Sequence, residues 1–214
     1  MTSIYKNIKN INFKNILNLL RSNCVLSLLT MILLFGISIG AFFSNFLDLD
    51  TRNTISSIFL TNFQNLINLP FTKTFFSTLS SYFLLILFTF SMGLSAWGNI
   101  FIPLIIFMQG FSLGMNSGYL CATYGLRGIF FYMVVLLPSL FIFCVALLLM
   151  ARESMNFSKK IASFLFLNEN FTSEERKKFI KFYFIRSGFI LIVITSAAIL
   201  GSAFNIIFSK FFNF

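Results

Sequence analysis

Five stretches of this chain contain no charged residue and are each long enough to cross a lipid bilayer as a helix. They cover residues 25–46, 75–97, 100–123, 129–150 and 188–208, and are 21 to 24 residues long. A helix rises about 1.5 Å per residue, so each stretch measures about 31 to 36 Å against a hydrocarbon core of about 30 Å. A β-barrel would need polar residues at alternate positions, which these stretches lack. The pattern predicts an all-α polytopic membrane protein with five transmembrane helices.

The composition excludes the other broad classes of protein. Hydrophobic residues make up 57% of the chain and charged residues 10%, whereas a soluble domain has about 25% charged residues. Intrinsic disorder requires low hydrophobicity and is excluded as well. The chain has no histidine, so it lacks the commonest general base and the commonest transition-metal ligand. Its 214 residues predict one membrane domain, 1–214.

The distribution of Lys and Arg predicts the orientation in the membrane. Twelve of these residues fall on the side of the N-terminus and four on the opposite side. Basic residues accumulate on the cytoplasmic side of membrane proteins. We therefore expect the N-terminus inside and the C-terminus outside, with the first span retained as an anchor because it is too long for a signal peptide.

Two segments outside the spans have the apolar spacing of amphipathic helices. Residues 4–20 carry apolar residues at near-helical spacing with lysines between them, which is typical of an interfacial helix on anionic lipid of the inner leaflet. In the outer loop, 47–74, the apolar face consists of Ile55, Phe59, Phe63 and Leu66. We expect this second helix to lie on the outer face, where it contacts either lipid or a partner protein.

The inner loop, 151–187, contains a sequence pattern that is typical of the N-terminus of a helix. Thr172 and Glu175 match a capping box, and basic residues follow them. We therefore expect a capped helix in this loop. Its basic residues are interpreted as determinants of topology and as lipid anchors, with a specific ligand site as the alternative.

Small residues recur every four positions in several spans. The spacing predicts smooth helix faces at which another backbone can approach closely. A permeation path is the alternative, although such a path usually brings ionisable residues into the spans, and these spans have none. The residues expected at helix contacts are Gly36, Gly40 and Ser44 in the first span, Gly110, Gly114 and Gly118 in the third, and Ala197 and Gly201 in the fifth.

Other residues in the spans predict local features. Gln109 and Asn116 are seven residues apart on one face of the third span, and we expect them to form interhelical hydrogen bonds rather than to bind a ligand. Pro103 and Pro138 should bend or loosen their helices. The very short linker at residues 98–99 predicts a tight antiparallel hairpin of the second and third spans, and the sequence YGLRG, 124–128, predicts a second tight turn.

No residue pattern indicates catalysis. All six acidic residues lie outside the spans, and Asp48 and Asp50 are too few ligands to indicate a cation site. We expect no enzymatic activity, no cofactor, no metal and no nucleic-acid partner, and we leave the oligomeric state open.

Residues 110–151 resemble the stage II sporulation protein M family of integral membrane proteins. The similarity lies in the glycine-spaced third span, the YGLRG turn and the proline-containing fourth span, and the sequence FGISIGAFFSN of the first span is similar as well. Many members of the wider family carry an acidic residue near the end of the last helix, where this chain has Asn205. We therefore expect a divergent member.

The resemblance implies a function in endospore formation. It implies a non-enzymatic membrane scaffold at the sporulation septum, in the mother-cell membrane. Such a scaffold recruits and positions peptidoglycan hydrolases resembling stage II sporulation proteins D and P while the forespore is engulfed. The alternative is the membrane subunit of an ABC-type transporter with a separate ATPase chain, in which the basic inner loop would couple the two.

Overall fold

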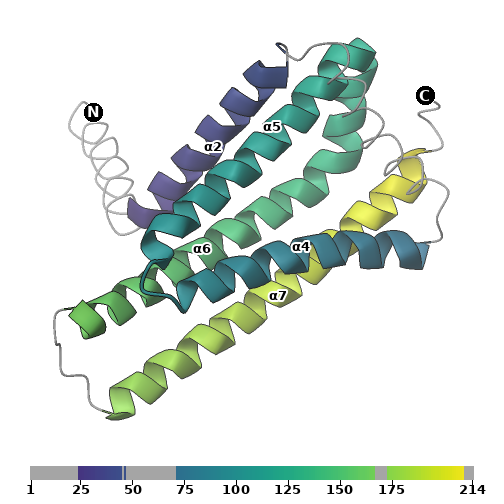
Figure 1. The fold of residues 1–214 in the computed structure, drawn as a ribbon. Coiled ribbons are helices and arrows are strands. Elements are labelled where there is room, and N and C mark those ends of the chain that lie inside the picture. Colours follow the sequence, from purple (N-terminus) through teal and green to yellow (C-terminus); the bar gives the residue numbers. More distant parts are fainter. Residues whose placement is uncertain (1–23, 45, 47–70, 167–172, 210–214) are drawn as a thin grey trace, which may run out of the picture.

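The computed structural model describes residues 24–44, 46, 71–166 and 173–209 (Figure 1). The regular elements in these residues are all helices: α2 (Cys24–Ser44), α4 (Phe71–Gly93), α5 (Gly98–Phe131), the π-helix η1 (Tyr132–Leu136), α6 (Leu137–Phe166) and α7 (Ser173–Ser209). The predicted all-α class is thereby confirmed for this part of the chain.

Four of the described helical stretches are long and apolar enough to cross a membrane. They are Cys24–Ser44, Phe71–Gly93, Gly98–Leu165 and Lys177–Asn205. The third stretch contains both predicted spans 100–123 and 129–150, so the five predicted spans correspond to four continuous helical stretches. Many side chains on the outside of the bundle are large and apolar, and Met31, Leu84 and Phe189 each expose about two thirds of their surface. Such a surface suits a hydrocarbon environment and would be unfavourable in water.

The chain reverses direction at Gly125. This residue has φ 56° and ψ −135° in the middle of an otherwise helical stretch, a conformation that residues with a Cβ rarely adopt. Gly128 lies directly against the backbone carbonyl of Leu120, and α5 and α6 run side by side in opposite directions (Figure 1). The turn therefore lies within the predicted segment 124–128.

Pro138 also has the predicted local effect. The π-helical turn η1 ends two residues before it. A proline lacks an amide donor and its ring clashes with the carbonyl four residues earlier, here that of Val134, and a π-turn accommodates such a clash. Pro103 lies within α5, which continues through it.

The predicted tight hairpin of the second and third spans is wrong. α4 and α5 are joined by a short turn at Leu94–Trp97, but they diverge from it (Figure 1), and α4 packs mainly on α6 and α7. The reason lies in the aromatic residues of α4. The Tyr82 ring stacks on Phe143 of α6 with centroids 4.1 Å apart, and the Phe90 ring stacks on Tyr183 of α7 at 5.0 Å.

The predicted inner loop is largely helical. α6 continues to Phe166, and α7 is one helix from Ser173 to Ser209, so the expected separate helix is the first part of α7. Several predictions concern residues outside the described part of the chain: the helix at 4–20, the outer face of Ile55, Phe59, Phe63 and Leu66, the pair Asp48 and Asp50, and the capping residue Thr172.

The turn at Gly125 can be tested with a pair of glycine substitutions. Gly125→Ala should lower the free energy of unfolding by about 1 to 3 kcal/mol, because alanine is strained at this φ and ψ. Gly188→Ala is the control: a Cβ at Gly188 would have no neighbour within 4 Å, and alanine in a helix is favoured over glycine. Thermal unfolding in detergent measures both changes, and equal effects would contradict the strained turn.

Candidate functional site: a glycine interface, two serine clusters and an open groove

The predicted glycine faces of the first and third spans lie against each other. A Cβ added to Gly36 would lie 2.6 Å from the carbonyl oxygen of Phe107, and one added to Gly40 would meet the carbonyl of Phe111. From the other side, Gly110 faces the carbonyl of Leu33 and Gly114 faces that of Ile37. Each glycine therefore faces backbone of the opposite helix, and the backbones of α2 and α5 approach as closely as the absence of side chains allows.

Ser44 extends the same interface toward the ends of both helices. Its side chain lies against Gly118, where an added Cβ would collide with the hydroxyl oxygen. The Ser44 hydroxyl donates a 2.8 Å hydrogen bond to the carbonyl of Ala41, and the residue is 1% exposed. All six small residues expected in the first and third spans thus belong to one interface.

The small residues of the fifth span lie next to Ser139 of α6. The Ser139 hydroxyl donates to the carbonyl of Ala197 at 2.9 Å, and a Cβ on Gly201 would lie 2.5 Å from that hydroxyl. Tyr82 of α4 shares a 3.1 Å hydrogen bond with the same hydroxyl. Ser139 thereby joins three helices. The sequence did not predict this contact, because a single serine has no distinctive spacing.

A second serine cluster lies at the other end of α6. Ser158 donates to the carbonyl of Ser95 at 2.8 Å and accepts a hydrogen bond from the backbone N–H of Asn99 at 3.2 Å. One turn earlier, Ser154 shares a 2.9 Å hydrogen bond with the Tyr183 hydroxyl. Both serines are fully buried. Ser158 attaches the turn between α4 and α5 to one end of α6, and Ser154 attaches α7 there. Neither serine was predictable from the sequence, because isolated serines have no distinctive spacing.

One ion pair is found in the described part of the chain. Arg186 of α7 donates to the Glu153 carboxylate of α6 at 2.7 Å, with Arg186 59% exposed. Lys160 lies over the Phe179 ring, 3.6 Å from its centroid. Both contacts join α6 and α7 near the serine cluster, and an exposed pair of this kind contributes about 1 kcal/mol or less.

The two amides of the third span do not form the expected hydrogen bonds. Gln109 and Asn116 are both half-buried on α5, and neither side chain has a hydrogen-bond partner among the described residues. Asn205, at the position where the family resemblance departs, is 7% exposed, and its side-chain oxygen has no hydrogen-bond partner in the described part of the chain.

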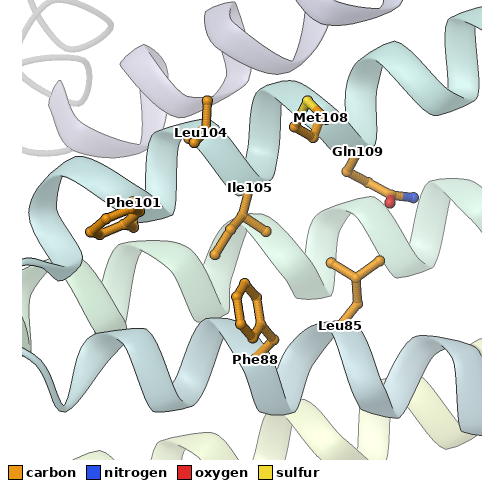
Figure 2. A pocket seen from close by; sticks show the side chains of 7 residues that line it. All are labelled: Leu85, Phe88, Phe101, Leu104, Ile105, Met108 and Gln109. Atoms are coloured by element: carbon orange, nitrogen blue, oxygen red, sulfur yellow. The ribbon is translucent and has the colours of Figure 1, made fainter.

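Gln109 lies at the edge of a groove between α4 and α5, which we call the α4–α5 groove (Figure 2). The groove has a volume of about 380 Å³ and is open to the outside of the bundle. Figure 2 shows α6 behind it and the Gln109 side chain directed toward α4. Its lining consists of Leu85 and Phe88 of α4 and of Phe101, Leu104, Ile105, Met108 and Gln109 of α5. Apart from one amide, the groove is apolar.

The glycine interface predicts a clear difference between two substitutions on α5. Gly114→Leu should lower the free energy of unfolding by at least about 1 to 3 kcal/mol, because its side chain meets the Ile37 backbone, which has no room to move aside. Met108→Leu is the control, because Met108 is 59% exposed, and it should change stability by less than about 0.5 kcal/mol. Leu113, which the sequence suggested as a lipid-facing control, is 7% exposed and unsuitable.

Thermal unfolding of the purified variants in detergent provides the measurement. If Gly114→Leu were as stable as Met108→Leu, the close approach of α2 and α5 would be refuted.

Comparisons with protein-family models, with curated proteins and with solved structures give no match for this chain. We therefore infer its function from its residues and their contacts.

Proposed function

We propose that this chain is an integral membrane protein that crosses the bilayer five times, with its N-terminus inside and its C-terminus outside. The stretch Gly98–Leu165 has 68 residues and would measure about 100 Å if it were straight, about three times the hydrocarbon core. Its reversal at Gly125 divides it into two legs that account for two crossings. The three remaining apolar stretches account for the other three.

We further propose that the protein is a non-enzymatic scaffold of endospore formation. It recruits and positions membrane-anchored peptidoglycan hydrolases at the septum, in the mother-cell membrane, while the forespore is engulfed. Anionic lipid of the inner leaflet is proposed to contact the basic ends of α6 and α7, where Lys159, Lys177, Lys178 and Lys181 are exposed.

The glycine interface is the observation that carries this proposal. The sequence FGISIGAFFSN and the segment starting at Gly110 are two of the elements on which the family resemblance rests, and they are far apart in the chain. In the structure they form the two sides of the contact between α2 and α5. Two separate pieces of sequence similarity that meet in one interface support a common architecture more strongly than either piece alone.

The five crossings can be tested with single cysteines. In a background without Cys24, Cys121 and Cys144, Thr123→Cys should react with a membrane-impermeant maleimide on intact cells. Asn99→Cys and Ser163→Cys should react only after permeabilisation, because residues 99 and 163 flank a stretch that crosses twice. Labelling of Asn99→Cys and Ser163→Cys from opposite sides would mean that Gly98–Leu165 crosses once, and the five-span topology would be wrong.

The scaffold function is tested by deletion of the gene in the bacterium that carries it. We expect engulfment to stall and the wall hydrolases to lose their septal position, as seen by fluorescence microscopy of tagged hydrolases. Complementation with the wild-type chain and with Met31→Leu, at a residue of α2 that is 69% exposed and lies outside the α4–α5 groove, should restore both. Normal engulfment with correctly placed hydrolases, or wall-cleaving activity of the purified protein alone, would contradict the proposal.

The ABC-type membrane subunit is the second candidate, and the helical extension of α6 and α7 favours it. These helices continue about 16 residues past the predicted span 129–150 and begin 15 residues before the span 188–208, so they offer a rigid inner surface to a cytosolic chain. Co-purification of an ATPase, together with ATP-dependent transport in vesicles, would favour this candidate over the scaffold.

A further inference from the structure

We propose that the α4–α5 groove binds a single transmembrane helix of a partner protein, and that this helix brings a hydrogen-bonding group to Gln109 near the middle of the bilayer. This inference rests on the proposed function, since the partner would be a membrane-anchored wall hydrolase. It adds the surface at which such an anchor docks and the chemistry that the surface requires.

The first step is the depth of Gln109. It lies nine residues after the start of the predicted span 100–123, or about 14 Å along a span of about 36 Å. Asn116, the other amide of the predicted span 100–123, lies about 10 Å from the outer end of the span and is nearer to hydrated headgroups. An unpaired amide is therefore most costly at Gln109, since the hydrocarbon core offers neither water nor lipid polar groups.

The second step is the absence of a partner within the described chain. The Gln109 side chain is half-buried, forms no hydrogen bond with the described residues, and lies at the edge of the groove (Figure 2). An acyl chain can fill the apolar part of the groove, but it has no donor or acceptor for the amide. A polypeptide segment carries a polar group to this depth, through a polar side chain or through a backbone carbonyl freed by a small residue.

The third step concerns the shape of the occupant. The groove is a hollow between two diverging helices, and its α5 side extends from Phe101 to Gln109, about 12 Å or two helical turns. In a two-fold symmetric dimer the groove of one copy would face the groove of the other copy. Two concave surfaces that face each other leave a gap between them rather than a contact. A single convex helix fits this surface, as does the membrane anchor of a protein whose main domain lies outside.

The proposal is tested by photocrosslinking in membranes. The full-length chain, with benzoylphenylalanine replacing Met108 in the groove or replacing Met133 as a control, is co-expressed with the full-length membrane-anchored wall hydrolase of the same bacterium. Met108 is 59% exposed and Met133 is 57% exposed, so both probes are accessible and only one lies in the groove. We expect a crosslink to the hydrolase from position 108 and none from position 133.

Two variants test the chemistry and the shape separately. Gln109→Leu removes the amide, and Leu104→Trp fills the groove at a side chain that is 55% exposed, so that folding should be retained. Each should reduce the amount of co-purified hydrolase by roughly three- to tenfold, the range expected when one interhelical hydrogen bond or its packing is lost. Asn116→Leu is the matched control, because it removes the other amide of the predicted span 100–123, which does not line the groove, and it should leave co-purification unchanged.

The outcomes separate this inference from the proposed function. If the hydrolase co-purifies equally with wild type and both groove variants, and no crosslink forms at position 108, the groove is not the docking site although the scaffold function stands. Crosslinking of position 108 only to lipid, or to a second copy of this chain, would also overturn the inference. If the wild-type chain does not retain the hydrolase at all, both the scaffold function and the inference are wrong.

Discussion

The close approach of the α2 and α5 backbones is the contact on which the rest of the bundle depends. In lipid there is no hydrophobic gain from bringing two apolar helices together, so association depends on packing and on polar contacts. Two glycines of each helix face a backbone carbonyl of the other helix: Gly36 and Gly40 on α2, and Gly110 and Gly114 on α5. The interface is therefore interlocked from both sides, and it holds α5 with the orientation that leaves its opposite face open.

The second constraint is the set of contacts that hold α4 and α7 on α6. The buried face of α6 is polar at its two ends and apolar in the middle. Ser139 lies at one end and Ser154 and Ser158 at the other, while Phe143, Leu147 and Met150 between them are fully buried. The serines form hydrogen bonds with α4, α7 and the turn that joins α4 to α5. Each such bond satisfies groups that would otherwise be unpaired in an apolar surrounding, and together they hold α4 and α7 on α6.

These two constraints together explain the groove. α5 is held by α2 through glycines, and α4 is held by α6 and α7 through aromatic stacking and serine hydroxyls, so that the two consecutive helices have different partners. α4 packs mainly on α6 and α7, and the two helices diverge from their connecting turn (Figure 1). The groove is the space that this divergence leaves, and Gln109 lies in it without a partner because no helix of the described chain crosses it.

Features that depend on the local sequence were predictable. Length and the absence of charge predicted helices for all five apolar stretches, and four-residue spacing identified the small faces of α2 and α5. The segment YGLRG, 124–128, predicted the tight turn, and the structure places the non-helical φ at Gly125 within it. Which helices of the chain pack against each other was not predictable in the same way. The short linker at residues 98–99 suggested a hairpin, yet the side chains of Tyr82 and Phe90 direct α4 to α6 and α7. Ser139, Ser154 and Ser158 have no distinctive spacing, and the face of Gln109 depends on which neighbours α5 packs against. The sequence by itself determined where helices form and which of their faces are smooth, because these are local properties; only the tertiary structure decided which faces meet, because that choice compares contacts between residues far apart in the chain.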